Sequence, residues 1–294
     1  NAVARMFCDI ITPDEKPFEG DSRNVLRTNI KAASDKGFTY YVAPELEYFY
    51  FKSSTNPEPL DNGGYFDQIT PDIATDLRRD TVLMLEELGI PVESSHHEAA
   101  PSQHEIDLRH TDAFTMADTV ITYKSVVKEI AMANGYYASF MPKPIMGVNG
   151  NGMHTHMSLF KGDINAFLDQ NEPYKLSSIG RQFCAGLLKH AKEITLVTNQ
   201  WVNSYKRLVP SYEAPTHVSW AEVNRSDLIR IPSFKPDRGD SRRIEYRAPD
   251  PSCNPYLAFS VMLAAGLNGI DNKLELSESS SNRSSEMSEK EKKS

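Results

Sequence analysis

Four segments of the chain carry charged or histidine side chains at every second position, with mostly apolar residues between them. Side chains two positions apart on a β-strand point to the same face of a sheet. Each segment therefore predicts a strand with one apolar face and one face rich in acids, histidines and arginines. The rows on the polar faces are Glu45 and Glu47; Glu105, Asp107 and Arg109; His154, His156 and Ser158; Arg243, Glu245 and Arg247.

Helices and strands are mixed along the chain without the regular alternation of a parallel sheet. Apolar residues at helical spacing predict helices at Asp72–Leu88, Thr115–Ala133, Ser177–Thr198 and Pro255–Leu267. Strands are expected at Tyr40–Phe51, Glu105–Arg109, Ala138–Met141, Met153–Phe160, His217–Trp220 and Arg242–Arg247. We expect an α+β fold with a mainly antiparallel sheet and helices packed on one face.

The composition limits the classes of partner that the chain can bind. The formal net charge of −8 argues against nucleic acid, and no stretch approaches the ~18 apolar residues of a membrane helix. Three distant cysteines, Cys8, Cys184 and Cys253, are typical of reduced thiols and favour the cytoplasm. Residues 277–294 are rich in serine, glutamate and lysine, so a mobile tail or loop is expected there.

The polar rows suggest phosphoryl-transfer chemistry. A single such row is most often a solvated sheet face. Adjacent carboxylates such as Glu45 and Glu47 repel each other, however, and a cation between them removes that conflict. Carboxylates with one or two histidines suit Mg²⁺ or Mn²⁺, and neighbouring arginines suit phosphate oxygens. Metal, acids and arginines together indicate a site for phosphoryl transfer.

Two loops point in the same direction. The Gly/Asn-rich turn Val148–Gly152 directly precedes the His154 strand, where glycine would let the backbone approach a ligand, although it can also be an ordinary hairpin turn. Asn203–Pro215 lacks clear periodicity and carries Lys206, Arg207 and Glu213. It is predicted to be a functional loop or lid.

Five blocks resemble, in family order, the signature blocks of type I glutamine synthetases. They are HHEAAPSQHE (His96–Glu105), KPIMGVNGNGMHTHMSLF (Lys143–Phe160), NSYKRLVPSYEAP (Asn203–Pro215), NRSDLIRIP (Asn224–Pro232) and RRIEYRAPDPSCNPYLAF (Arg242–Phe259). The resemblance implies a curved sheet with helices on its outer face and the active site on its concave face. It also implies a homo-oligomeric ring, a dodecamer by family resemblance.

The resemblance further implies ATP-dependent ligation of ammonia to L-glutamate, with ATP and two or three Mg²⁺ or Mn²⁺ ions. One metal would be held by Glu47, Glu98 and Glu105, and a second by Glu45, His154 and Glu245. ATP would contact Glu93, His156, Ser158, Arg225, Arg230 and Arg243. Glutamate would contact Asn149, Gly150, His154, Arg207, Glu213 and Arg247. Catalytic roles would fall to Glu98 and Tyr65 at the ammonium site, to Glu213 on a flap, and to Arg225.

The resemblance covers residues 1–273 as one catalytic domain, with 274–294 as a polar tail or loop. The family's small N-terminal domain and C-terminal end are expected to be missing from this stretch. Residues 277–294 contain no tyrosine, so the nucleotidylation that controls one bacterial branch would lack an acceptor. Three alternatives stay open: a γ-glutamyl ligase for polyamines or other amines, a non-catalytic structural or regulatory relative, and a free-standing nucleotide-binding module.

Overall fold

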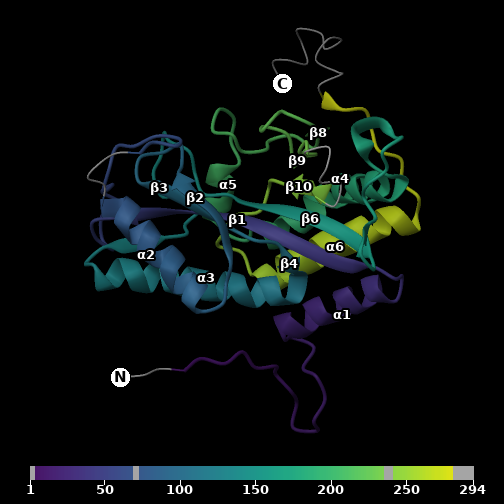
Figure 1. Cartoon of the computed structure of the whole chain (residues 1–294), viewed down its shortest axis with the longest axis horizontal. Coiled ribbons are helices and arrows are strands. Elements are labelled where there is room, and N and C mark those ends of the chain that lie inside the picture. The colour runs from purple at the N-terminus through teal and green to yellow at the C-terminus, as the bar shows by residue number, and fades with distance from the viewer. Residues whose placement is uncertain (1–3, 69–72, 235–240, 281–294) are drawn as a thin grey trace.

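The structure, a computed structural model, describes residues 4–68, 73–234 and 241–280. Its main element is a ten-stranded sheet (Figure 1). The central strands are β1 (Thr39–Phe51), β3 (Gln103–Leu108), β6 (Met153–Lys161) and β10 (Ile244–Tyr246). The edges are formed by β2 (Val92–His97) on one side and by β9 (Ile229–Arg230) and β8 (Trp220–Ala221) on the other.

The strand order is β2-β3-β1-β6-β10-β9-β8, and every neighbouring pair in it is antiparallel except β8–β9. Three short strands lie off this path: β4 (Thr111–Asp112) and β5 (Tyr137–Ser139) pair with β1, and β7 (Ile164–Asn165) pairs with β6. The prediction of an α+β fold with a mainly antiparallel sheet is therefore confirmed.

Six α-helices are present in the described residues. They are α1 (Ser22–Ser34), α2 (Ile73–Glu87), α3 (Ala113–Ala133), α4 (Ser178–Thr198), α5 (Val202–Arg207) and α6 (Pro255–Asp271), with a 3₁₀ turn at Pro173–Lys175. Hydrogen bonds from capping side chains fix the first residue of several helices. Asp112 accepts hydrogen bonds from the backbone N–H groups of Phe114 and Thr115, so α3 begins two residues before its predicted start. Ser177 caps α4 and Asn254 caps α6 in the same way.

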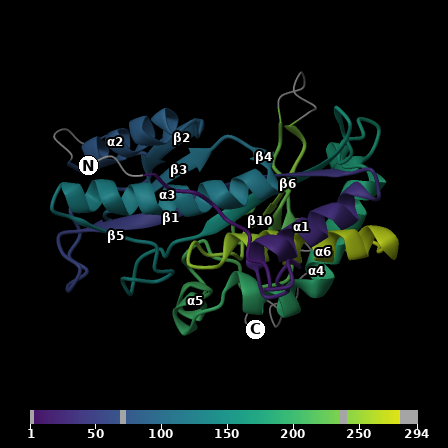
Figure 2. The same cartoon turned by 90° about the horizontal axis from the view of Figure 1, so that it is seen from below.

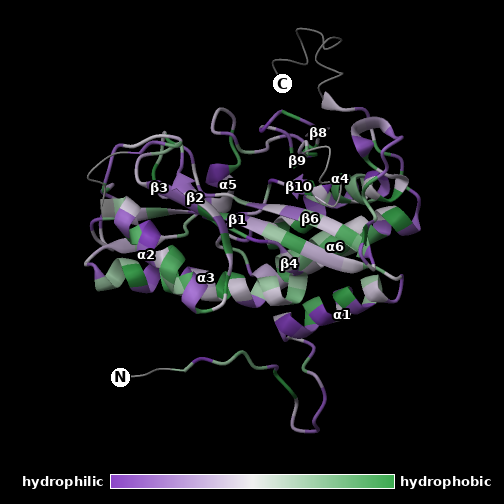
Figure 3. Cartoon of the chain, in the orientation of Figure 1, coloured by the Kyte–Doolittle hydropathy of each residue, from purple (hydrophilic) through white to green (hydrophobic). Residues whose placement is uncertain are grey.

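One face of the sheet is apolar and is covered by helices. Leu46 pairs with Ile106 on β3 and with Met153 on β6, and all three side chains are buried. The Tyr123 hydroxyl on α3 donates a hydrogen bond to the Leu46 carbonyl at 3.1 Å. Seen from below, α3 runs along β1, with α1 and α6 beside it (Figure 2). Apolar residues recur along these helices, whereas many loops above the sheet are polar (Figure 3).

Several elements differ from the sequence prediction. Helix α1, strand β2 and strand β9 were not predicted, and α5 occupies the first part of the predicted lid Asn203–Pro215. The strand expected at His217–Trp220 lies at Trp220–Ala221, and Asp72 of the expected second helix is outside the described residues. No helix among the described residues is long and apolar enough to cross a membrane.

Candidate active site on the polar sheet face

Strand register brings the polar rows together. Residues directly opposite each other on antiparallel strands share a face. Glu105 lies opposite His96 on one side and Glu47 on the other. The next row joins Asp107, Glu45 and His154 across β3, β1 and β6. A third row joins His156, Glu245 and Arg230 across β6, β10 and β9. Six adjacent strands thus contribute polar side chains to one sheet face.

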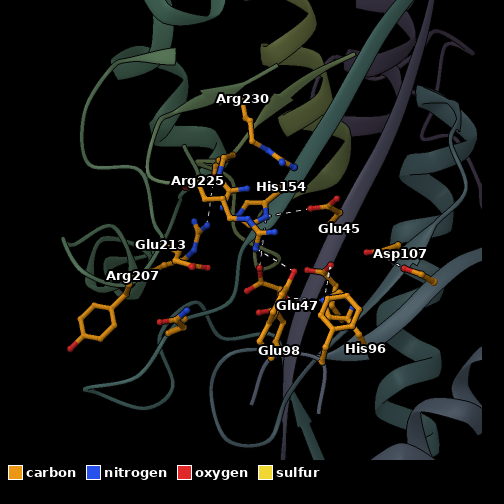
Figure 4. A pocket seen from close by; sticks show the side chains of 18 residues that line it. Glu45, Glu47, His96, Glu98, Asp107, His154, Arg207, Glu213, Arg225 and Arg230 are labelled. Carbon is orange, nitrogen blue, oxygen red and sulfur yellow. Dashed lines mark hydrogen bonds and ion pairs between the residues drawn. The ribbon is translucent and has the colours of Figure 1, made fainter. Parts of the chain in front are cut away.

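A pocket opens over these rows (Figure 4). Acidic side chains and histidines from the strands form one part of its wall, and arginines from β9, from the end of α5 and from the loops next to β9 and β10 form another. Its lining is Glu45, Glu47, Tyr65, Phe66, Ser94, His96, Glu98, Glu105, Asp107, Asn149, Gly150, His154, Arg207, Tyr212, Glu213, Arg225, Arg230 and Arg247.

Glu47, Glu98 and Glu105 form the first acidic group. Each offers an oxygen within 4.8 Å of the others. Burial, reinforced by the charge of Glu98 and opposed by Arg207, raises the pKa of Glu47 to about 8. Burial and then the charge of Glu45 raise the pKa of Glu105 well above its ordinary value. Glu47 and Glu105 are buried and Glu98 is half-buried, and three carboxylates that repel one another in this way are the oxygen donors that Mg²⁺ and Mn²⁺ prefer.

Glu47 is fixed by neutral hydrogen-bond donors. Its Oε2 accepts a hydrogen bond from the Gly152 backbone N–H and another from the Gln103 amide, both at 2.9 Å. The same Gln103 amide group lies 3.1 Å from the Gly150 carbonyl and 3.2 Å from Asn151 Oδ1. These contacts orient one oxygen of Glu47 and leave Oε1 facing His154, 3.8 Å from its Nδ1.

His154 is the nitrogen donor of the second group. Its Nδ1 lies 3.5 Å from Glu45 and 3.9 Å from Glu245. Burial and then the charge of Arg247 lower the pKa of His154 to about 4, so the ring is neutral at neutral pH and keeps a lone pair for a metal. Burial alone would raise the pKa of Glu45, but His156 and His154 together lower it well below its ordinary value.

His156 also lies within 4.8 Å of Glu45 and Glu245, but its ring nitrogens are already committed. Arg243 Nε donates a hydrogen bond to His156 Nδ1 at 3.1 Å. The His156 proton must therefore sit on Nε2, which lies 2.6 Å from Glu45 Oε1. A nitrogen that carries a proton cannot bind metal, so His154 fits the second group better than His156.

Glu245 is completely buried and is held by two arginines. Arg230 donates to its Oε2, and Arg247 donates to its Oε1. Burial alone would raise the pKa of Glu245, but His156 and Arg247 together lower it. A carboxylate has about four acceptor positions, so each oxygen can still face a cation. Glu245 thus links the acidic part of the pocket to its arginines.

Two glycines permit close packing beside Arg207. A Cβ at Gly152 would lie 2.6 Å from Arg207 Nη2 and 2.8 Å from His154 Nε2. A Cβ at Gly150 would lie 2.3 Å from the Pro142 carbonyl oxygen. Arg207 is buried, and its guanidinium donates to the backbone carbonyls of Arg247 and Ala248. The Gly/Asn turn therefore does more than reverse the chain, because its glycines leave room for the side chains of the pocket.

Aromatic side chains close the other side of the pocket. Arg225 Nη1 donates to the Tyr65 hydroxyl at 3.3 Å, and its guanidinium carbon is 5.4 Å from the ring centre of Tyr65. Phe66 stacks on His96 with ring centres 4.5 Å apart. His96 in turn lies 3.0 Å from Glu98 and 3.7 Å from Glu105. An aromatic wall next to carboxylates suits a small cation.

Behind Glu98 lies a second polar cluster of Asp61, His97 and His104. Asp61 Oδ1 accepts hydrogen bonds from His97 Nε2 at 2.8 Å and from the Ser102 N–H at 3.0 Å. His97 Nδ1 donates to the Glu98 carbonyl at 2.7 Å. Arg78 donates to His104 Nδ1 at 2.7 Å, which puts a positive charge in the cluster and argues against a metal there. The cluster anchors the backbone that carries Glu98.

Comparison with known proteins places this arrangement in a family. A family model described as glutamine synthetase, catalytic domain, matches residues 19–294. The chain belongs to the glutamine synthetase family. It is 57% identical over 272 residues to a glutamine synthetase of Mycolicibacterium smegmatis and 56% identical over 278 residues to one of Methanosarcina mazei. These matches cover 91% and 93% of this chain, but 61% and 62% of the relatives.

A solved structure agrees with the family. The chain resembles the cryo-EM structure of Plasmodium falciparum glutamine synthetase with a TM-score of 0.85 and 28% sequence identity. The similarity covers 91% of this chain and 58% of that one. The chain therefore spans about three fifths of the length of these relatives.

Most residues that the family resemblance pointed to line the pocket, but five do not. Glu245 is completely buried and is paired with Arg230 and Arg247, which do line the pocket. His156, Ser158 and Arg243 lie farther along β6 and just before β10. Glu93 is exposed on β2, and its charge acts on Arg243. The residues expected to contact ATP thus include Arg225 and Arg230 in the pocket and a further group beside it.

Five residues line the pocket that the sequence did not assign to the site: Phe66, Ser94, His96, Asp107 and Tyr212. A signal existed for two of them. Asp107 is two positions after Glu105 on β3, and His96 is two positions before Glu98, near the end of β2. Phe66 and Tyr212 lie on irregular segments, where position in the sequence does not predict the direction of a side chain.

Proposed function

We propose that the protein containing this chain ligates ammonia to the side-chain carboxylate of L-glutamate, with ATP converted to ADP and phosphate. The γ-phosphate of ATP passes to the carboxylate oxygen to give γ-glutamyl phosphate. Ammonia then attacks the carbonyl carbon, the C–O bond to phosphate breaks, and glutamine is released. The matching family model and the two relatives are all described as glutamine synthetases, which supports this assignment.

The observation that carries the proposal is that buried carboxylates and arginines meet in one pocket. Glu47 and Glu105 supply one wall, and Arg207, Arg230 and Arg247 supply the other. Phosphoryl transfer to a carboxylate brings anionic groups together, so it needs both a cation site and fixed positive charges. A binding site for nucleotide alone would not require this arrangement.

The donor sets suit divalent metal. Glu47, Glu98 and Glu105 would hold one ion. Glu45 and Glu245 would hold a second with His154, whose Nδ1 lies 3.5 and 3.9 Å from their carboxylates, and Mg²⁺ or Mn²⁺ would fit these oxygen-rich groups. When bound, the ions supply charge neutralisation to the phosphates of ATP. The group of His96, Glu105 and Asp107 also meets within 4.8 Å, and would be the place for a third ion.

The arginines bind and orient the substrates. Arg207 lies beside the glycine turn and donates to the Arg247 carbonyl. We assign the carboxylates of glutamate to these two arginines, with Asn149, Gly150 and His154 also lining the pocket. Arg225, Arg230 and Arg243, with Glu93, His156 and Ser158, would contact ATP. Because guanidinium groups do not lose their protons at neutral pH, they keep the anions aligned throughout the reaction.

Ammonium binding and exclusion of water fall to the remaining residues. Tyr65 and Glu98 both line the pocket, where a carboxylate oxygen of Glu98 would attract ammonium and accept its proton. Glu213 lies on the segment after α5 and faces the pocket. We assign it to a flap that covers γ-glutamyl phosphate and keeps water away from it.

We further propose that residues 1–273 form one catalytic unit, followed by the polar segment 274–294, and that the active site occupies the concave face of the curved sheet. A homo-oligomeric ring and a cytoplasmic location follow from the family resemblance in the same way. The segment after α6 contacts the edge of the sheet. The Ser277 carbonyl accepts a hydrogen bond from Trp220 Nε1 on β8 at 2.7 Å, and Ser280 Oγ donates to Asp227 at 2.9 Å.

The test is a product assay on the protein expressed from its complete gene. ATP and glutamate are supplied with ammonia, methylamine or putrescine, and both phosphate and the amide product are measured. We expect ammonia to be the preferred amine and Glu47→Gln to abolish product formation. A protein that prefers putrescine would be an amine ligase instead, and one that binds ATP without forming any amide would refute the proposal.

A further inference from the structure

The segment that carries Glu213 has an unusual backbone. Ser211 has φ 78° and Glu213 has φ 54°, so two residues with a Cβ occupy the left-handed region within three positions. That region is sparsely populated by residues other than glycine, asparagine and aspartate. Such a conformation persists only when surrounding contacts enforce it. Tyr212 lies between the two strained residues, so its side-chain contacts can enforce their conformation.

Tyr212 rests on a buried cation. Lys143 Nζ lies 3.8 Å from the centre of the Tyr212 ring, well within the range of a cation–π interaction. Lys143 is 3% exposed, and it forms no ion pair with any residue that the structure describes. The only hydrogen bond of its ammonium group within that part of the chain goes to the Val148 carbonyl. A buried ammonium with so few partners gains strongly from an aromatic face.

Lys143 also holds the other end of the same segment. Its backbone N–H donates to Asn203 Oδ1 at 2.7 Å, and Asn203 Nδ2 donates to the Lys143 carbonyl at 3.0 Å. Asn203 lies on α5, nine positions before Tyr212. The chain between them is therefore attached at both ends to one residue, and that residue lies at the start of the loop that carries Asn149 and Gly150.

We propose that Lys143 and Tyr212 form a latch that holds Glu213 over the pocket, so that both are positioning residues for the ligation. The inference rests on the proposed function and adds to it the contact that keeps the flap closed. Because the backbone on either side of Tyr212 is strained, loss of the ring contact releases the flap. The latch also connects the flap to the loop at the glutamate site.

An open flap changes the products of the reaction. Water reaches γ-glutamyl phosphate, its oxygen attacks the carbonyl carbon, and the C–O bond to phosphate breaks. Glutamate and phosphate are regenerated, and the net reaction is hydrolysis of ATP. The ratio of phosphate released to glutamine formed therefore measures how well the latch holds, and a purely structural loss of activity would leave that ratio unchanged.

The experiment compares Tyr212→Leu with Tyr212→Phe, which keeps the aromatic face. Lys143→Met removes the cation at similar length, and Tyr205→Leu is the matched control, since Tyr205 is half exposed on the same segment. Phosphate and glutamine are measured together in the protein expressed from its complete gene. Amide hydrogen exchange of residues 208–214 is recorded without substrates, which gives a readout that does not depend on activity.

Tyr212→Leu is expected to raise the phosphate-to-glutamine ratio and the exchange rate of residues 208–214 by between about twofold and thirtyfold. Tyr212→Phe and Tyr205→Leu should match the parent. In the Lys143→Met background, Tyr212→Leu should add little, because the contact is already lost. Unchanged exchange and an unchanged ratio in Tyr212→Leu would overturn the latch. A parent protein that makes no glutamine but shows the exchange pattern would overturn the proposed function instead.

Discussion

Replacement of Glu47 by glutamine should raise the free energy of unfolding of the metal-free protein, and most of that advantage over the parent should disappear when divalent metal is bound. Glutamine has the shape of glutamate, and its amide oxygen can still accept from Gly152 and Gln103. In the metal-free protein, burial and Glu98 raise the pKa of Glu47 from 4.5 to about 8. A carboxyl group with a raised pKa binds its proton more tightly in the folded state. The unfolded chain therefore loses this proton at a lower pH than the folded protein does, and the free energy of unfolding falls as pH rises from 4.5 towards 8.

The size of the effect follows from the same shift. At pH 7 about 2.5 pH units of the interval have been crossed, at ~1.4 kcal/mol per unit, so the ionisable group costs up to about 3.5 kcal/mol. Glu47→Gln should recover that amount in chelator at pH 7 and recover little near pH 4.5. With Mn²⁺ at a hundredfold excess over its dissociation constant, the parent gains about 2.7 kcal/mol. The variant should gain much less, because it has lost a charged ligand.

Urea unfolding at pH 7, in EDTA and in excess Mn²⁺, measures both effects. The matched control is Glu129→Gln, an exposed carboxylate on α3, whose unfolding should follow the parent in both buffers. Two results would refute the reasoning. One is a Glu47→Gln protein that is less stable than the parent in EDTA; the other is a variant that gains as much from Mn²⁺ as the parent does.

Three further substitutions probe the supports of the site. Gly152→Ala should weaken Mn²⁺ and glutamate binding at least tenfold, because its Cβ would lie 2.6 Å from Arg207 and 2.8 Å from His154; titration calorimetry and the KM for glutamate measure this, and parental values would count against the steric argument. Gln103→Leu should reduce Mn²⁺ affinity about 10- to 100-fold by freeing Glu47, and unchanged affinity would show that Gln103 orients nothing. Burial alone would raise the pKa of Asp61, but His104 and His97 lower it well below 3.8, so its stabilisation exists above that pH and is lost as pH falls. Asp61→Asn should therefore cost about 2–4 kcal/mol at pH 7 and progressively less below pH 4 in urea unfolding, and a gap independent of pH would contradict this.

The long strands and helices could be predicted from the sequence because one face of each is buried. The rows on β1, β3 and β6 have period two, and the starts of α4 and α6 coincide with Ser177 and Asn254 as caps. Helix α1 is mostly polar and has few buried residues, among them Leu26 and Ala33, so few apolar residues mark it in the sequence. Strand β2 has the sequence VESSHH and lies at an edge with most of its side chains outward, so its pattern resembles a loop. Tertiary contacts, not local pattern, decide such segments.

The candidate site was predictable only in part, for a related reason. Glu45, Glu47 and His154 could be grouped by chemistry, but their contacts depend on register between strands far apart in the chain. The tautomer of His156 depends on Arg243, and no local pattern shows that Arg243 would donate to it. The Lys143–Tyr212 contact joins two irregular segments, where neither period of secondary structure applies. These contacts depend on how distant segments pack in the fold, which the residue types alone do not determine.

The strand order also has a consequence for the path by which the protein folds. Glu47 meets Gly152 across 105 positions of the chain, and Glu45 meets His156 across 111. Contacts of such long range close large loops and tend to form late in folding. The mutual repulsion of the carboxylates is therefore felt only when the last strands join, after the transition state has buried much of the apolar face. Metal that relieves this repulsion acts on interactions absent from the transition state, so Mn²⁺ should slow unfolding far more than it speeds refolding.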